Sequence, residues 1–250
     1  MRLFGVEIDV IRRDDAVRAV LEMAKTPGPC RFVVTPNADH VLLLQGNAAM
    51  RRAYADASLV IADGWPVVIA SRLLARPLPE RVTGSDLVPH LFSRADERDP
   101  VRAYLFGAAP GVADRAARAI EARYQGVRVV GAYGPPFGFE QDPDETRAAL
   151  DRIRDADPDL LLVGLGAPKQ ELWVHEHRAE IRARVALCIG ATIDFLAGER
   201  ARAPVWMQRA GLEWLHRMMS EPKRLVPRYA RNALEFPGLV LREWREQRRL

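Results

Sequence analysis

Six short apolar runs recur along the chain, and each precedes a turn of small residues and a segment with helical periodicity. The runs are 31–35, 58–63, 101–107, 127–133, 159–166 and 185–191. The helices that we expect between them are 37–55, 65–75, 110–124, 143–156 and 168–184. Because parallel strands are joined by crossovers, usually helices, this alternation predicts a Rossmann-like α/β fold: a mostly parallel sheet with helices on both faces.

The strand pattern stops near residue 200, and the charge of the chain changes there. Residues 200–250 hold 12 Lys and Arg against 5 Asp and Glu, a balance of +7, whereas the preceding residues are slightly acidic. We therefore predict an α/β core over residues 1–200 and a basic helical appendage over residues 201–250. Within the appendage, residues 206–218 have amphipathic helical spacing, and the next helix should bend at Pro227.

The composition does not fit a membrane-spanning or disulfide-stabilised protein. The best apolar stretch, 59–70, is interrupted by Asp63 and Pro66 and is shorter than the roughly 18 to 20 residues of a membrane span. The first residues lack the apolar segment of a signal peptide, and Cys30 and Cys188 are the only cysteines. We expect a protein of the reducing cytoplasm.

Polar residues follow two of the predicted strands, where ligands of open α/β sheets bind. Thr35 and Asn37 follow the first run, and Asp63 ends the second beside a glycine. A carboxylate at that position could take a proton from a hydroxyl group as a general base. The alternative for all three is a role as a helix N-cap, which for Asp63 means the helix starting at Trp65.

Glycines mark two other strand ends, at Gly107 and Gly111 and at Gly164 and Gly166. Such turns let the backbone approach an anion at a helix N-terminus. Neither turn spells the Gly-x-Gly-x-x-Gly pattern or a Walker loop, so tight strand-to-helix turns are the alternative.

No metal site is predicted. His175 and His177 lie two residues apart on a predicted helix and therefore point to different faces. The acid pairs at 142–144 and 157–159 are better explained as a helix cap and as a turn into a strand.

Six blocks, in this order, resemble the WecG/TagA/CpsF family of bacterial glycosyltransferases over nearly the whole chain. They are Thr-Pro-Asn at 35–37, Ala-Asp-Gly at 62–64, Arg-Val-Thr-Gly-Ser-Asp at 81–86, Gly-Leu-Gly-Ala-Pro-Lys-Gln-Glu at 164–171, Gly-Ala-Thr-Ile-Asp-Phe at 190–195, and Arg-Ala-Pro at 202–204 continuing through Gly-Leu-Glu-Trp at 211–214 to Glu-Pro-Lys-Arg at 221–224. The resemblance implies an inverting transfer of an N-acetylmannosamine-type or glucose-type sugar from a UDP-sugar to a polyprenol diphosphate-linked sugar. Wall teichoic acid, enterobacterial common antigen and exopolysaccharide are the products of such pathways.

By the same resemblance, Asp63 is the base, and Thr35, Asn37, Arg81 and Gln170 are active-site residues around it. Arginines of the C-terminal region close over the UDP diphosphate and neutralise it as it departs. No metal or other cofactor is expected beside the donor substrate. The residues that we predict to bind substrate are Gly107, Gly164, Gly166, Lys169, Glu171, Arg217, Arg224 and Arg228.

The basic appendage is rich in Arg, Trp and Met, a composition typical of a helix that binds an anionic lipid surface or a phosphate group. The alternative is that its aromatic side chains pack in the core and its charged face is solvated. On the lipid-binding interpretation, we expect a peripheral protein on the inner face of the plasma membrane that does not bind nucleic acid; a homo-oligomer is one option for its assembly. Two alternatives are a nucleotide-sugar oxidoreductase and a nucleic-acid-binding module. The first requires a Gly-x-Gly-x-x-Gly after the first strand, which is absent, and the second leaves Asp63, Asn37 and Gln170 without a purpose.

Overall fold

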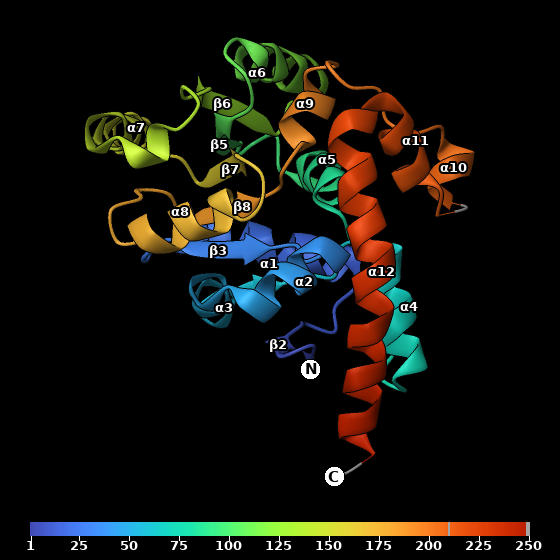
Figure 1. Ribbon diagram of the computed structural model, residues 1–250. Helices are drawn as coiled ribbons and strands as arrows, with labels where there is room; N and C mark the ends of the chain where they lie inside the picture. The colour runs from blue at the N-terminus through green and yellow to red at the C-terminus, as the bar shows by residue number, and fades with distance from the viewer. Residues whose placement is uncertain (210, 249–250) are drawn as a thin grey trace.

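The computed structural model describes residues 1–209 and 211–248, and a six-stranded sheet lies at its centre (Figure 1). Every strand pair in this sheet is parallel, and the spatial order is β4-β3-β8-β7-β5-β6. The strands are β3 (Arg31–Val34), β4 (Leu59–Val60), β5 (Val101–Gly107), β6 (Val127–Tyr133), β7 (Leu160–Gly164) and β8 (Val185–Cys188). Each predicted run therefore contains a strand. A short antiparallel pair, β1 (Arg2–Leu3) and β2 (Val6–Glu7), lies outside the predicted elements.

Helices cover both faces of the sheet, which confirms the predicted fold class. One face carries α1 (Arg13–Lys25), α5 (Gly84–Arg94), α6 (Val112–Arg123) and α9 (Thr192–Leu196). The other carries α2 (Ala38–Gly46), α3 (Ala48–Ala55), α4 (Trp65–Leu73), α7 (Pro143–Ala156) and α8 (Lys169–His177), with the 3-10 turn η1 (Phe139–Gln141) before α7. The sequence pattern did not predict α1 and α5.

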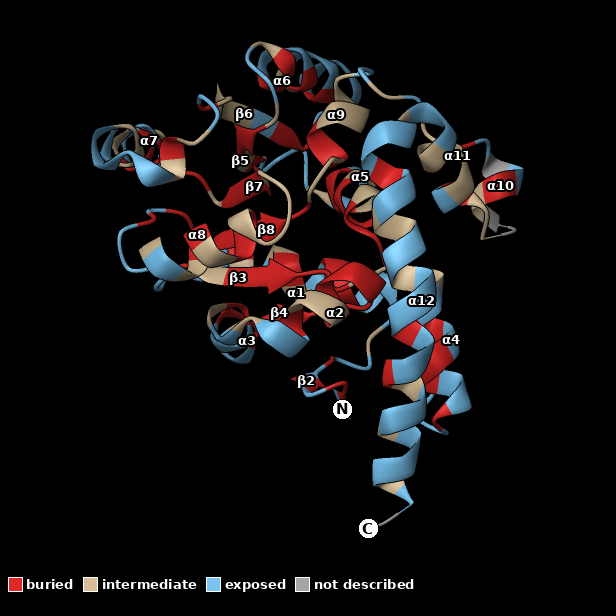
Figure 2. Cartoon of the chain, in the orientation of Figure 1, coloured by how far each residue is buried: buried red, intermediate tan, exposed pale blue. Residues whose placement is uncertain are grey.

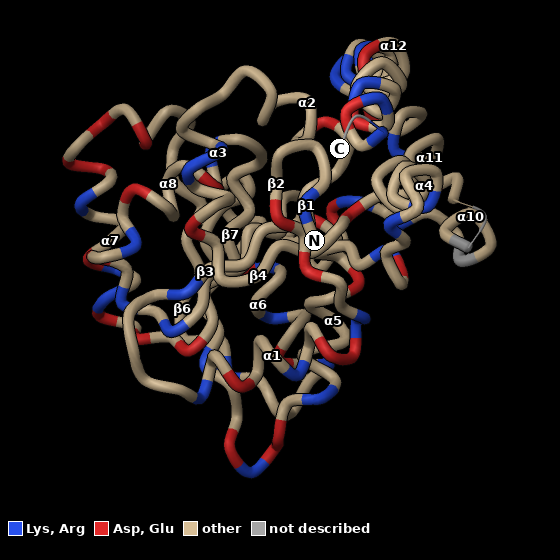
Figure 3. Tube along the Cα trace, turned by 90° about the horizontal axis from the view of Figure 1, so that it is seen from below, with Lys and Arg blue, Asp and Glu red and all other residues tan. Residues whose placement is uncertain are grey.

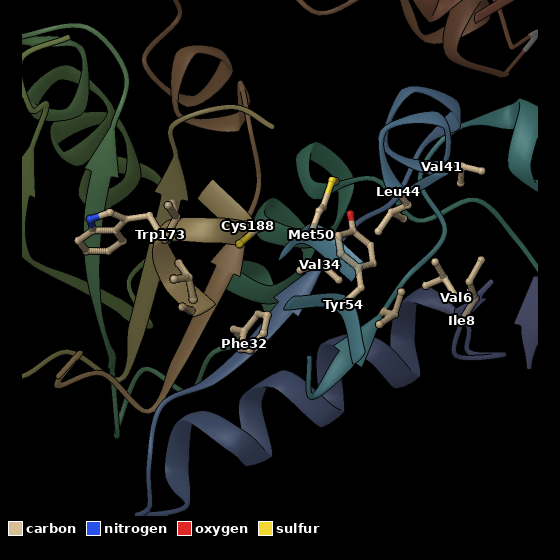
Figure 4. Packing of buried hydrophobic residues seen from close by; sticks show 14 of the residues in the cluster. Val6, Ile8, Phe32, Val34, Val41, Leu44, Met50, Tyr54, Trp173 and Cys188 are labelled. Atoms are coloured by element: carbon tan, nitrogen blue, oxygen red, sulfur yellow. The ribbon is translucent and has the colours of Figure 1, made fainter. Parts of the chain in front are cut away.

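Strand residues alternate between two buried hydrophobic clusters, one on each face. In β3, Phe32 and Val34 belong to the cluster under α2, α3 and α8, whereas Val33 belongs to the cluster under α1 and α5. Figure 4 shows part of the first cluster, where Tyr54 of α3 and Trp173 of α8 lie over the strands. A strand that is buried on both faces must be apolar at every position, which explains the continuous apolar runs.

Two predicted helices are interrupted. The helix expected over 37–55 divides at Asn47, whose backbone is extended and whose side chain accepts a hydrogen bond from the Met50 N–H at 2.9 Å. The amphipathic helix expected over 206–218 divides into α10 (Val205–Arg209) and α11 (Glu213–Ser220). Gly211 lies between them with a φ of 74°, a left-handed conformation that ends a helix.

The last described element is a long helix, α12 (Pro222–Gln247), which continues without interruption through Pro227, where a bend was predicted, and through Pro237. It lies along α2 and the β1–β2 pair, where Phe236 contacts Phe4 with ring centroids 5.5 Å apart. Figure 2 shows that most of its outer surface is exposed. Among the described residues, no helix combines the length and apolar character that crossing a bilayer requires.

Candidate active site

The carboxyl ends of the six parallel strands meet at one edge of the sheet, which brings the predicted site residues together. Thr35 follows β3, and Asp63 lies three residues beyond the end of the neighbouring strand β4. The Asp63 N–H donates a hydrogen bond to the Pro36 carbonyl at 2.8 Å. The Thr-Pro-Asn and Ala-Asp-Gly blocks are therefore in direct contact at this edge.

Asp63 is half-buried, and among the described residues no group donates a hydrogen bond to its carboxylate. The N-cap of α4 is Gly64, and no side chain caps that helix. Asp63 therefore does not have the alternative role of a helix cap. Burial raises the pKa of Asp63 to about 7; the positive charges of Arg81 and Arg217 oppose this rise. A carboxylate that titrates near neutral pH is suited to accept a proton during catalysis.

Asn37 has the structural role that the alternative interpretation assigned to it. Its side-chain oxygen caps α2 by accepting hydrogen bonds from the N–H groups of Asp39 at 3.0 Å and His40 at 3.3 Å. It also lies close to the residue after Asp63, because a Cβ placed on Gly64 would be 3.5 Å from the Asn37 Cβ. Thr35 is buried and donates a hydrogen bond to the Cys188 carbonyl at 3.4 Å, which links β3 to β8.

Arg81 belongs to a network of four charged side chains that we call the Arg81 cluster: Arg81, Asp86, Arg202 and Glu213. Arg81 contacts Asp86 at 3.2 Å and Glu213 at 3.0 Å, and Arg202 contacts Asp86 at 2.8 Å. Burial acts to raise the pKa of Asp86, but the hydrogen bonds and charges of Arg202, Thr83 and Arg81 hold it below its ordinary value. The cluster joins the core to the appendage, and three of its members were not predicted, although all lie within the family blocks.

The three predicted arginines of the appendage differ in their surroundings. The positive charge of Arg217 opposes the burial that raises the pKa of Asp63, and its guanidinium lies 5.8 Å from the centre of the Phe195 ring. Arg228 pairs with the buried Asp39 at 2.9 Å. Arg224 is exposed and pairs with Glu221, one turn away, at 2.8 Å.

Two of the predicted glycines are required by close backbone packing. A Cβ on Gly107 would lie 2.6 Å from the Gly164 carbonyl, and one on Gly164 would lie 2.9 Å from the Gly190 oxygen. This fits the alternative interpretation of tight turns and brings the ends of β5, β7 and β8 close together. Gly166 has a φ of 80° and open space at its Cβ position.

A cavity of about 400 Å³ opens beyond the ends of β5, β6 and β7. Its lining includes Gly164, the aromatic ring of Phe137 and an ion pair between Lys169 and Glu140. The Lys169 ammonium lies 4.6 Å from the centre of the Phe137 ring, whose side chain is 99% exposed. Lys169, a predicted substrate-binding residue, therefore lines a ligand-sized opening, whereas no pattern in the sequence indicated Phe137.

The other two predicted residues of this block lie inside the protein. Gln170 is 2% exposed and Glu171 is 0% exposed, and they are hydrogen-bonded to each other at 2.8 Å. Burial raises the pKa of Glu171 to about 7. A buried pair that was not predicted lies nearby: Tyr54, whose hydroxyl is 3.1 Å from the Nδ1 of His40. Burial lowers the pKa of His40 to about 3, so its ring is neutral at physiological pH.

Within residues 1–209 and 211–248, no three His, Cys, Asp or Glu side chains are grouped as metal ligands would be. His175 instead contacts Asp56 at 2.8 Å, and His177 lies 3.5 Å from Glu180.

Comparison with known proteins gives a consistent result. The family described as "Glycosyl transferase WecG/TagA/CpsF family" matches residues 1–250. The chain is 30% identical over 209 residues to an N-acetylglucosaminyldiphosphoundecaprenol N-acetyl-beta-D-mannosaminyltransferase of Bacillus spizizenii, an alignment that covers 82% of this chain and 79% of the relative. It is also 30% identical over 194 residues to a protein of the same name from Staphylococcus aureus, with 78% and 74% covered.

Proposed function

Since the chain belongs to the WecG/TagA/CpsF family of glycosyltransferases, we propose that it transfers a sugar from a UDP-sugar to a sugar linked to polyprenol diphosphate. The donor sugar is of the N-acetylmannosamine or glucose type, and the product serves cell-wall or exopolysaccharide biosynthesis. The relatives support the acceptor, because their name specifies an N-acetylglucosamine diphosphoundecaprenol substrate. Because this is a family of glycosyltransferases, membership also argues against the alternative that the protein is an oxidoreductase.

The observation on which the mechanism rests is the state of Asp63. In the proposed reaction its carboxylate takes the proton of an acceptor hydroxyl while that oxygen attacks the anomeric carbon of the donor. The bond between the anomeric carbon and the phosphate oxygen breaks, and UDP leaves with the electron pair. A single displacement of this kind inverts the anomeric configuration. The pKa of about 7 and the absence of a donor to the carboxylate among the described residues both suit this role.

The positive charge needed by the leaving group is available beside the base. Without Asp63, the Arg81 cluster and Arg217 contain three guanidinium groups and two carboxylates, which gives a net charge of +1. When Asp63 takes the proton, it loses its negative charge and the surroundings acquire a net positive charge. This change coincides with the growth of negative charge on the departing diphosphate, which arginine binds well.

In the proposed complex, the nucleoside of the donor occupies the cavity beyond β5, β6 and β7. The exposed ring of Phe137 offers a surface on which a uracil base can stack, and beside it lies the Lys169 ammonium, which is paired with Glu140. The cavity starts at β7, three strand positions from β4 in the sheet order, which is about 14 Å at the usual strand spacing. An extended nucleotide-diphosphate sugar bridges such a distance, so its sugar would reach Asp63.

The outer side of α12 supports the proposed contact with an anionic membrane. Its large exposed apolar side chains are Val226, Leu234, Leu241 and Trp244. At 100° per residue these four fall within an arc of about 80°. Its buried residues are Leu225, Phe236 and Leu239, and these lie on the opposite side.

Cations accompany this apolar arc. Lys223 and Arg245 project from the same side of α12, whereas all of its acidic residues lie elsewhere on the helix. The guanidinium of Arg248, which follows the helix, lies 3.9 Å from the centre of the Trp244 ring. In Figures 1 and 3, α4, α10, α11 and α12 gather on one side of the molecule, and Trp206 and Trp214 of this group are 64% and 46% exposed. An apolar surface with basic residues and no acids is the pattern of an interfacial helix.

The proposed function is tested by incubating the protein with a panel of UDP-sugars and a short-chain polyprenol diphosphate N-acetylglucosamine. Formation of a lipid-linked disaccharide with release of UDP is the expected result. UDP-sugar turnover only with water, or no turnover with any donor, would contradict the proposal. Random-sequence DNA in a filter-binding assay should not be retained, which tests the nucleic-acid alternative.

A further inference from the structure

Two polar side chains at the start of α8 are buried in an otherwise hydrophobic part of the core. Gln170 and Glu171 are almost completely inaccessible. Burial, and with it the charge of Glu171, raises the pKa values of Tyr54 and Cys188. Tyr54 and Cys188 belong to the cluster in Figure 4, together with Trp173. Because it is sealed from solvent, Glu171 has no surface to offer to a substrate.

The two side chains form a chain of hydrogen bonds that ends on the backbone. The Nε2 of Gln170 donates to the Oε1 of Glu171 at 2.8 Å, and the Oε1 of Gln170 accepts from the Gly190 N–H at 3.0 Å. Whether the Glu171 carboxyl is ionised or carries a proton on its unpartnered Oε2, its Oε1 accepts, and a backbone N–H can only donate, so the two contacts allow one orientation of the Gln170 amide. Glu171 therefore determines which end of the amide faces Gly190.

Gly190 lies at the middle of the active edge. It follows β8, which lies between β3 and β7 in the sheet. On one side the Gly190 oxygen closely approaches Gly164 at the cavity, and on the other Thr35 bonds the β8 backbone at Cys188. A displacement of this turn would change the distance between the cavity and Asp63.

The carboxylate is costly at this position, because its second oxygen, Oε2, is buried and has no hydrogen-bond partner. Burial of a polar atom without a partner destabilises the folded state, and an apolar side chain of similar length would fill the same space without that cost. The feature that an apolar residue cannot supply is the acceptor for Gln170.

We propose that Glu171 is a positioning residue: it holds the Gln170 amide in the orientation that bonds Gly190 and thereby fixes the turn between the donor cavity and Asp63. Its effect on catalysis rests on the proposed transferase function. Its effect on the turn does not, and can be measured without substrate.

The decisive variant is Glu171→Met, with Glu176→Met, an exposed position on the same helix, as the matched control. We expect Glu171→Met to lower kcat about 10- to 100-fold, the scale of a small misplacement of reacting groups, with Kd for UDP changed less than about threefold. Its Tm should be equal to or above that of the unmodified protein, because the unpartnered oxygen is removed. A role in folding alone predicts the reverse: a lower Tm, and a kcat for the folded fraction that is unchanged.

Two further variants test the route of the effect. Glu171→Gln keeps an acceptor for Gln170 and should retain kcat within about threefold. In the Gln170→Leu background, Glu171→Met should change kcat less than about threefold, because the residue through which it acts is gone. A large additional loss in the double variant, or a Glu171→Gln variant as impaired as Glu171→Met, would overturn the proposal. Glu171→Leu replaces Glu171→Met if the latter does not fold.

The readout that needs no activity is hydrogen exchange at the Gly190 amide. We expect its exchange to become at least 10-fold faster in Glu171→Met and to remain unchanged in Glu171→Gln and Glu176→Met. Unchanged exchange at Gly190 in the folded Glu171→Met variant would overturn the positioning role. If the unmodified protein transfers no sugar but the exchange result is as expected, the proposed function fails and the positioning role stands.

Discussion

Replacement of Asp63 by asparagine should abolish transfer and, at alkaline pH, stabilise the protein. Asn keeps the size of the side chain but cannot take a proton, and a positioned general base contributes about 10²- to 10⁴-fold in rate. This corresponds to about 3 to 5 kcal/mol of transition-state stabilisation. Binding of UDP should stay near normal, because the cavity and its Lys169 are not altered.

The stability effect follows from the pKa. In the unfolded chain Asp63 titrates near 3.8, whereas in the folded protein burial raises its pKa to about 7. Between these two values the folded state binds more protons, so the free energy of unfolding falls as pH rises from about 4 to 7 and levels off above 7. The difference corresponds to at most about 4 kcal/mol, and because Asp63 is only half-buried we expect about 1 to 4 kcal/mol. The Asp63→Asn variant would not carry this cost.

The assay combines two measurements on the same preparations. Transfer is followed by UDP release with a lipid-linked acceptor between pH 5.5 and 8.5, and stability by urea unfolding at pH 4.5 and pH 8. For the unmodified enzyme, kcat/KM should rise with pH through about 7 and then level off, because the base must be ionised. Asp155→Asn, at an exposed position on α7, is the control. Retention of more than a tenth of the activity by Asp63→Asn, or a pH profile without a rise near 7, would refute the role of Asp63 as base.

Four further predictions follow from the site and the appendage. Activity should survive EDTA, because guanidinium groups supply the positive charge; loss in chelator with recovery in Mg²⁺ or Mn²⁺ would contradict this. Phe137→Ala should raise the Kd for UDP about 10-fold, in line with the loss of one stacked base, and an unchanged Kd would exclude the ring from the nucleotide site. Arg217→Gln should lower kcat more than 10-fold and raise the apparent pKa of Asp63, since it removes a cation whose charge lowers that pKa. If the midpoint of the pH–activity profile does not move, Arg217 does not act on Asp63. Truncation after Arg202 should leave a folded core, because all six strands precede that point, but with little activity and no binding to anionic vesicles at low salt; a truncated chain that does not fold would make the appendage part of the core.

The strands were predictable because a strand that is buried on both faces is a continuous apolar run in the sequence. Leu160 and Leu162 enter one cluster while Leu161 and Val163 enter the other, so β7 is apolar at every position. The pair β1–β2 was not predictable in this way, because two-residue strands are shorter than any periodic pattern. In α1, charged residues are almost as numerous as apolar ones, and only the inner face is buried. The helical spacing of its apolar residues was therefore not recognised in the sequence.

The site was predictable only as far as single strand ends reveal it. Asn37 and Asp63 were recognisable because Asn37 follows an apolar run and Asp63 ends one. The contact of Arg81 with Glu213 was not, since Glu213 lies 132 residues away in the sequence and the contact exists only in the folded chain. Likewise, nothing local in the sequence indicates that Glu171 points into the core, because it occupies the same block as the accessible Lys169.

The most direct test of the proposed function is the structure of the transferred linkage. The protein is incubated with each UDP-sugar and a short-chain polyprenol diphosphate N-acetylglucosamine, and the lipid-linked disaccharide is isolated and its anomeric configuration determined by NMR. The proposed single displacement with Asp63 as base predicts one donor-dependent disaccharide whose new linkage is inverted relative to the donor. A product with retained configuration, or the absence of a disaccharide with every donor tested, would contradict it.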